Sequence, residues 1–298
     1  MQVLTERTMN HLRMPEVRYD LVMADGSHWE IVAGNEKAVT IVSQLGFTMQ
    51  LRMTPGVIEP VQHGSRRRLL VRVEQPMSIA DCYVPLISKS NGVLACTLCP
   101  CGHWGGPYIN LVRLSLAIAR ETQARGGVLI HGALAERDGA GVILAAPGGT
   151  GKTTASNRLP APWRSLCDDI TLVVKDPQGS YWGHPWPTWS TFLDGGTGGA
   201  WDVQKAVPVK GIFFLSRAVE DRVERLGPGQ AVSLLVESVR QASMSMAQDM
   251  SKEEISTLHL ERFNNLCDLT RVVPVHTLDI SLTGVFWREI EQTLDGDR

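Results

Sequence analysis

A glycine-rich segment near the middle of the chain constrains the fold more than any other feature. The apolar run 141–145 leads straight into it, and a helix-compatible stretch follows. The segment reads Ala146, Pro147, Gly148, Gly149, Thr150, Gly151, Lys152, Thr153 and Thr154. Glycines between a strand and a helix let successive backbone N–H groups surround phosphate oxygens. We therefore predict a nucleotide-binding P-loop (Walker A) over residues 147–154; the alternative is an ordinary glycine-rich turn.

Two side chains of this segment have defined tasks in such a loop. Lys152 is expected to reach the β- and γ-phosphates, and Thr153 to offer its hydroxyl to Mg²⁺. Pro160 limits the following helix to about two turns, since proline cannot continue a helix interior. The loop does not name a reaction, because ATPases, GTPases and kinases all use it.

The rest of the chain alternates between strand and helix patterns, which predicts an α/β fold. In the second half we expect strands at 128–135, 141–145, 170–174, 211–215 and 275–281, and helices at 110–125, 230–241 and 284–294. The first half is strand-rich, with candidates at 18–23, 29–32, 49–53 and 69–73. Glycines and a proline at 102–107 suggest a boundary between an N-terminal region, 1–106, with a role in substrate recognition, and a nucleotide-binding domain, 107–298.

Two adjacent carboxylates, Asp168 and Asp169, open the apolar strand that follows the loop helix. One could bind Mg²⁺ while the other accepts a proton from an incoming hydroxyl. The alternative is a solvated turn with two acids. Their short distance from the P-loop favours the catalytic interpretation.

Together these residues resemble the HPr kinase/phosphorylase family, within the phosphoenolpyruvate carboxykinase-like P-loop fold. The resemblance covers residues 128–175 and includes His131, which lies before the turn Asp138-Gly139, in addition to the loop and the aspartate pair. It implies ATP and Mg²⁺ as ligands, with Lys152, His131 and an aspartate as catalytic residues. Asp168 is the preferred base and Asp169 the preferred Mg²⁺ ligand beside Thr153; His131 as an ordinary core histidine is the equal alternative.

The chain also departs from that family. We find no counterpart of its glycine-rich signature segment with a metal-binding glutamate, or of its catalytic arginine loop, although Arg217 and Arg240 are available arginines. The segments 184–189 and 201–203 are similar to divergent relatives encoded beside radical-SAM peptide-modification enzymes, the SynChlorMet cassette ScmC-type proteins. This resemblance implies a peptide or small-protein acceptor in place of the bifunctional kinase and phosphorylase activity.

A cysteine cluster is the sharpest feature outside the loop. The cluster consists of Cys96, Cys99, Cys101 and His103. These side chains are soft ligands that could bind Zn²⁺. Buried, reduced thiols are the equal alternative. A second cluster, of tryptophans at 163, 182, 186, 189 and 201, suggests proline-rich aromatic loops that as a group face a substrate. Core packing is the favoured alternative for any one of these tryptophans.

Composition excludes several partners. The chain has 298 residues and a formal net charge of -2, so no strong field attracts nucleic acid or an anionic membrane. The start of the sequence has no apolar targeting segment, and we expect a cytoplasmic protein, with a homo-oligomer as one option. The leading hypothesis is a Mg²⁺–ATP-dependent kinase acting on a hydroxyl of a peptide or small protein. The alternatives are a small-metabolite phosphotransferase and a nucleotide-binding module that recognises a peptide without phosphorylating it.

Overall fold

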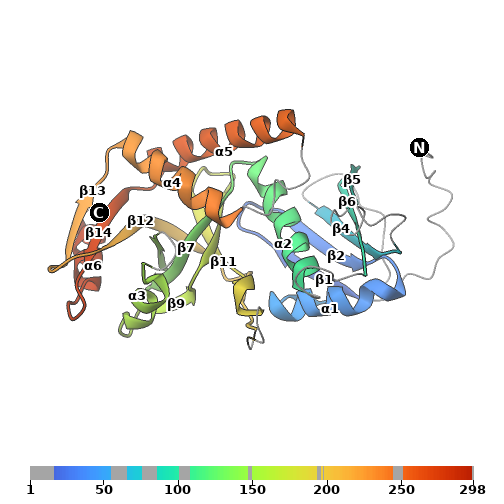
Figure 1. The fold of residues 1–298 in the computed structure, drawn as a ribbon, viewed down its shortest axis with the longest axis horizontal. Helices are drawn as coiled ribbons and strands as arrows, with labels where there is room; N and C mark the ends of the chain where they lie inside the picture. Colours follow the sequence, from blue (N-terminus) through green and yellow to red (C-terminus); the bar gives the residue numbers. More distant parts are fainter. Residues whose placement is uncertain are drawn as a thin grey trace.

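A computed structural model describes residues 17–54, 66–75, 86–100, 108–146, 150–192, 196, 198–243 and 251–296. Within these ranges the strands form two sheets with both parallel and antiparallel pairings, and helices cover or separate the sheets (Figure 1). The predicted α/β class is therefore confirmed.

The first sheet comes from the N-terminal part of the chain and has the strand order β3-β1-β2-β4-β6-β5. Its strands are β1 (Arg18–Val22), β2 (His28–Ala33), β3 (Arg52–Met53), β4 (Arg66–Val73), β5 (Leu86–Ser90) and β6 (Val93–Leu98). The short 3-10 helix η2 (Glu36–Ala38) and helix α1 (Val39–Thr48) follow β2. The expected strand 49–53 was wrong over most of its length, because α1 extends to Thr48 and only two residues pair with β1.

The second sheet has the order β11-β10-β7-β8-β12-β14-β13, with β9 paired to β7. Its strands are β7 (Val128–Arg137), β8 (Ala140–Ala145), β9 (Arg164–Cys167), β10 (Ile170–Lys175), β11 (Tyr181–Trp186), β12 (Val207–Arg217), β13 (Arg222–Arg225) and β14 (Val275–Ile280). Strand β11 pairs with β10 and also, through two residues, with β12.

Strands β7 and β8 form the predicted antiparallel hairpin. Asp138 and Gly139 form its turn with positive φ angles of 52° and 79°, as a two-residue turn between twisted strands requires. On the edge away from β7, strand β8 pairs in parallel with β12. Strand β12 in turn pairs in parallel with β14. The C-terminal end of β8, where the predicted P-loop begins, is therefore in the interior of the sheet.

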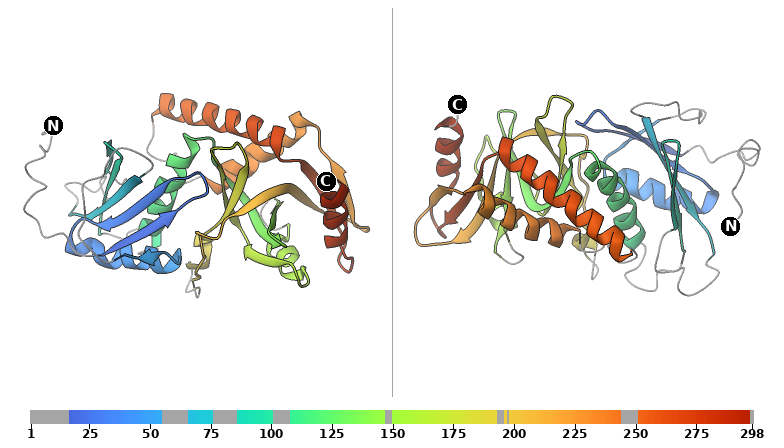
Figure 2. Two further views of the ribbon diagram at one scale, coloured as in Figure 1. Left: turned by 180° about the vertical axis from the view of Figure 1, so that it is seen from behind. Right: turned by 90° about the horizontal axis from the view of Figure 1, so that it is seen from above.

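The remaining helices are α2 (Tyr108–Gln123), α3 (Lys152–Arg158), the short 3-10 helix η4 (Trp189–Phe192), α4 (Pro228–Ala242), α5 (Lys252–Val272) and α6 (Trp287–Gly296). Helix α2 lies between the two sheets, and α4 and α5 lie together along one side of the second sheet (Figures 1 and 2). Helix α3 has 7 residues, as the proline after it predicted. Among the described residues, no helix combines the length and apolar character needed to span a membrane.

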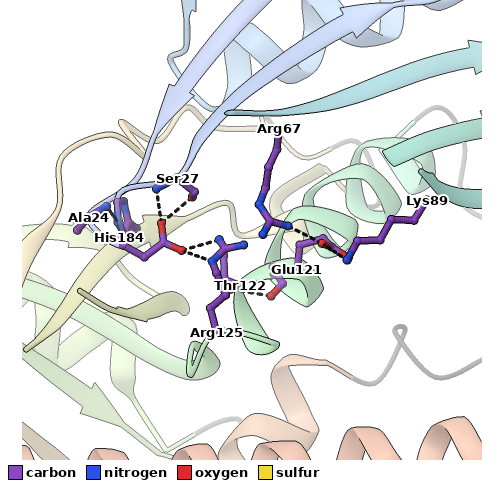
Figure 3. Close-up of polar contacts among 10 residues, drawn as sticks. Ala24, Ser27, Arg67, Lys89, Glu121, Thr122, Arg125 and His184 are labelled. Atoms are coloured by element: carbon purple, nitrogen blue, oxygen red, sulfur yellow. Dashed lines mark hydrogen bonds and ion pairs between the residues drawn. The ribbon is translucent and has the colours of Figure 1, made fainter. Parts of the chain in front are cut away.

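Polar contacts join the first sheet to the second (Figure 3). Asp25, in the turn after β1, accepts hydrogen bonds from Nε (2.9 Å) and Nη2 (2.5 Å) of Arg125, which follows α2. The backbone N–H of Ala24 donates to Nε2 of His184 in β11 at 3.2 Å. His184 is fully buried, and its Nδ1 donates to the Val203 carbonyl at 2.7 Å. Burial lowers the pKa of His184, consistent with a neutral ring that accepts one hydrogen bond and donates another.

The two sheets also share apolar packing. One continuous hydrophobic cluster includes Leu21 and Leu69 of the first sheet, Leu114 of α2, and Val173 and Val275 of the second. The sheets lie on either side of the predicted boundary near residue 106, and whether the two regions are separate domains stays a prediction.

Candidate active site

Strand pairing places His131 next to the aspartate pair. His131 of β7 lies opposite Ile170 of β10 in the antiparallel register. Asp168 and Asp169 form the bend between β9 and β10, immediately before Ile170. Since β9 also pairs with β7, the bend is held against the strand that carries His131. Residues distant in sequence are thereby brought to one end of the hairpin.

The glycine-rich segment predicted to be a P-loop is described at its two ends, Ala146 and 150–153, while Pro147, Gly148 and Gly149 lie outside the described residues. Gly151 has φ 106°, a left-handed conformation that glycine adopts without strain. Lys152 begins α3 with its side chain 6% exposed, and Nζ donates to the Ala146 carbonyl at 3.0 Å. The lysine side chain therefore turns back toward the residue that follows β8.

Asp169 lies between two basic side chains. Its Oδ1 is 2.9 Å from Nε2 of His131 and 3.8 Å from Nζ of Lys152. Burial acts to raise the pKa of Asp169, but the His131 hydrogen bond and the charges of His131 and Lys152 outweigh it and lower that pKa. Burial lowers the pKa of Lys152, although Asp169 and Asp168 oppose the effect. The structure thus brings two predicted catalytic residues, His131 and Lys152, into contact with Asp169, the predicted Mg²⁺ ligand.

Asp168 has different partners from its neighbour. Its Oδ2 accepts a hydrogen bond from the Thr153 hydroxyl at 3.3 Å, and its Oδ1 accepts from the Thr188 hydroxyl at 3.0 Å. Thr188 follows β11 and is buried. No spacing rule connects Thr188 with the P-loop, so sequence reasoning missed it as a site residue.

Helix α4 supplies further site residues that sequence reasoning missed. Oε1 of Gln241 lies 2.7 Å from Nδ1 of His131, and the Ser238 hydroxyl donates to the His131 carbonyl at 3.1 Å. Glu237 accepts a hydrogen bond from Nε2 of Gln241 at 2.8 Å. The spacing 237, 238 and 241 places these side chains on one turn of the helix, but only tertiary packing shows that this turn faces β7.

The two arginines noted in the sequence lie on different sides of this cluster. Nε of Arg217, at the end of β12, donates to the Thr150 carbonyl of the P-loop at 3.4 Å. Arg240 of α4 forms a two-pronged contact with Glu237, through Nε and Nη2, each at 2.7 Å. Arg217 therefore contacts the glycine-rich segment directly, whereas Arg240 contacts Glu237, which in turn accepts a hydrogen bond from Gln241.

A family model for the SynChlorMet cassette protein ScmC matches residues 94–295, which include every site contact described above. The chain belongs to the ScmC family. A search of curated proteins found no match. The family match spans both sheets, since it begins within β6 and continues to α6.

The proposed zinc cluster of this ScmC-family chain stays a prediction, because Cys101 and His103 lie outside the described residues. Cys96 and Cys99 are buried free thiols, and Cys96 packs in the hydrophobic cluster. Burial raises the pKa of Cys96 to about 12, against the influence of Arg113. This environment favours the alternative of a reduced, uncharged thiol for Cys96.

The tryptophans do not form the expected substrate-facing loops. Trp182 and Trp186 lie in strand β11, and Trp189 lies in η4. Trp163, Trp186, Trp189 and Trp201 are all buried in the two hydrophobic clusters. Most of this group therefore fills the core, and Trp189 also donates from Nε1 to Ser115 of α2 at 3.0 Å.

Proposed function

We propose that this protein is a Mg²⁺–ATP-dependent kinase with an HPr kinase-like P-loop core. It transfers the γ-phosphoryl group to a serine or threonine hydroxyl of a peptide or small protein. The observation that carries the proposal is the position of Asp169 between His131 (2.9 Å) and Lys152 (3.8 Å). A carboxylate beside the P-loop lysine is where phosphoryl transfer to a hydroxyl needs its proton acceptor.

The oxygen atoms of Asp168 and Thr153 fit Mg²⁺. Hydroxyl and carboxylate oxygens are ligands that Mg²⁺ prefers, and Oγ1 of Thr153 and Oδ2 of Asp168 lie 3.3 Å apart. When bound there, the ion would neutralise charge on the β- and γ-phosphates. These contacts favour Asp168 on the metal side and Asp169 as the base, the reverse of the preference from sequence.

Asp169 then acts on the acceptor. Its carboxylate takes the proton of the acceptor hydroxyl while the hydroxyl oxygen bonds to the γ-phosphorus of ATP. The bond from the γ-phosphorus to the leaving oxygen of ADP breaks in the same transfer. Lys152 contacts the phosphates, and its burial in the loop strengthens that charge interaction.

The test is phosphoryl transfer from radiolabelled ATP to candidate peptides, with wild-type protein and Lys152→Ala compared. Transfer is expected from wild type and should fall by a factor of about 100 or more in the variant, since an electrostatic contact to the transferring group is lost. Lys210→Ala, which removes an exposed lysine of β12, is the matched control and should behave like wild type. Equal, minimal transfer by wild type and Lys152→Ala across good substrates would contradict the proposal.

The same assay separates the alternatives. Transfer to a small metabolite but to no peptide would indicate a metabolite phosphotransferase. ATP binding without turnover, unaffected by substituting either aspartate with asparagine, would indicate a module that recognises a peptide without phosphorylating it.

A further inference from the structure

One turn of helix α4 contacts His131 through both its backbone and its ring. Ser238 donates to the His131 carbonyl at 3.1 Å, and Gln241 meets Nδ1 of the ring at 2.7 Å. Nε2, the opposite ring nitrogen, faces Asp169 at 2.9 Å. The ring therefore bridges α4 and the carboxylate proposed as the base.

Which atom donates in each hydrogen bond follows from Glu237 and Arg240, the residues farthest from Asp169 in this series of contacts. Arg240 holds Glu237 through two hydrogen bonds of 2.7 Å. That contact, together with Gln241, lowers the pKa of Glu237 to about 2, so Glu237 is an acceptor only. Gln241 must then present its Nε2 to Glu237, at 2.8 Å, and its Oε1 to His131. Since Oε1 can only accept, Nδ1 of His131 must carry a hydrogen. The ionised carboxylate of Asp169 is also an acceptor only, so Nε2 carries a hydrogen as well.

We propose that Gln241, oriented by Glu237, is a positioning residue that keeps a hydrogen on Nδ1 of His131 and directs Nε2 to Asp169. This deepens the proposed function and rests on it for the role of Asp169 as base. A ring that lost the Nδ1 hydrogen would still donate from Nε2, but it would no longer place a positive charge beside the Asp169 carboxylate. Neither Gln241 nor Glu237 touches the described part of the P-loop, so their effect on transfer passes through His131.

The geometry predicts different effects for three variants of α4. Gln241→Leu removes the acceptor facing Nδ1. Gln241→Glu keeps an acceptor there and should preserve the Nδ1 hydrogen. Glu237→Leu leaves the Gln241 amide free to turn either way, so its effect should be intermediate. Gln178→Leu, in the exposed turn between β10 and β11, is the matched control.

The direct measurement is the nitrogen spectrum of the full-length protein labelled with ¹⁵N-histidine, with the His131 signals assigned from a His131→Gln variant. We expect wild type, Gln241→Glu and Gln178→Leu to show a hydrogen-bonded, hydrogen-bearing Nδ1. In Gln241→Leu the His131 signals should shift to those of an unrestrained ring. Unchanged His131 signals in Gln241→Leu would overturn the proposal, whatever the protein catalyses.

Kinetics provide the second measurement. Loss of a hydrogen-bond partner of a functional histidine typically reduces activity by about 10- to 100-fold. We expect Gln241→Leu to lower kcat by that factor with KM for ATP unchanged, and Gln241→Glu to recover most of it. A rise in KM with unchanged kcat would contradict a positioning role. If wild type transfers no phosphoryl group, the proposed function fails, while the spectrum still decides the role of Gln241.

Discussion

At the scale of single residues, the neighbours Asp168 and Asp169 have different surroundings. Asp168 contacts two threonine hydroxyls, whereas Asp169 contacts a histidine and a lysine. Hydroxyl partners leave room for a cation to join the carboxylate. Basic partners stabilise the ionised carboxylate, and one of them is Lys152, the proposed phosphate contact.

Asparagine substitutions should therefore separate the two roles. Asp168→Asn is expected to raise the Mg²⁺ concentration needed for half-maximal transfer by about ten-fold or more, because a ligand loses its charge. Asp169→Asn is expected to lower kcat by about 100- to 10,000-fold with little change in Mg²⁺ dependence, because a base is lost. Titration of transfer against Mg²⁺ at saturating ATP measures both, and the opposite pattern would restore the assignment preferred from sequence.

Which site residues could be predicted follows from how each is marked in the chain. Lys152, Thr153 and the aspartates belong to local patterns with a physical meaning, so spacing alone indicated them. His131 was indicated only by a family resemblance. Thr188 and Gln241 belong to no local pattern, because their positions depend on how β11 and α4 pack around β7.

At the scale of elements, the hairpin β7–β8 carries much of the candidate site, with His131 on one strand and the start of the glycine-rich segment after the other. Its turn needs positive φ at both central residues, and Asp138-Gly139 meets that need. The hairpin strands were predictable because apolar runs and turn residues agreed there.

A pair of glycine substitutions tests the turn. Open space surrounds the Cβ position at both Gly139 and Gly229, but only Gly139 has a positive φ, 79°. Gly139→Ala should lower the free energy of unfolding by roughly 1–2 kcal/mol through backbone strain. Gly229→Ala, in the first turn of α4, should be neutral or raise it by roughly 0.4–1 kcal/mol. Denaturant unfolding of both variants measures the difference, and equal stabilities would contradict the strained turn.

Other elements escaped prediction for physical reasons. The β-branched residues of α1, such as Val39 and Ile41, do not favour a helix on their own. Packing against the first sheet stabilises the helix there. Helix α5 is polar along most of its 21 residues and was not predicted. Strand β11 falls within the tryptophan-containing segment that was interpreted as proline-rich loops, and it contains Pro185. Pro185 lies beyond the two residues that pair with β12, so its missing N–H breaks no hydrogen bond to that strand.

At the scale of the whole molecule, the contacts around Asp25 link the first sheet to the region of the site. The Asp25 side chain is 3% exposed and accepts from Arg125 and Ser27. Burial acts to raise the pKa of Asp25, but the hydrogen bonds from Ser27 and the charge and hydrogen bond of Arg125 lower it below the ordinary value of 3.8.

This junction should make stability depend on pH in a defined direction. Because the folded pKa lies below 3.8, the stabilisation is fully present above that value and is lost as the pH falls through the folded pKa. Asp25→Asn should therefore lower the free energy of unfolding by about 1–3 kcal/mol at pH 7, with a smaller difference from wild type at pH 3. Asp202→Asn, at an exposed position, is the control. A pH-independent difference would show that the Asp25 charge is not involved.

The double pairing of β11 has a mechanical consequence. Because β11 bonds to both β10 and β12, the strands β7, β8, β12, β11 and β10 form a closed circuit. These five strands have no free edge strand from which the pairing could be lost one strand at a time. Separating any two neighbouring strands still leaves them joined through the other three. The aspartate bend precedes β10, and the glycine-rich segment follows β8, so both are attached to this circuit. They should therefore keep their mutual spacing until the circuit itself unfolds, so adjustment to an acceptor must come from elements outside it.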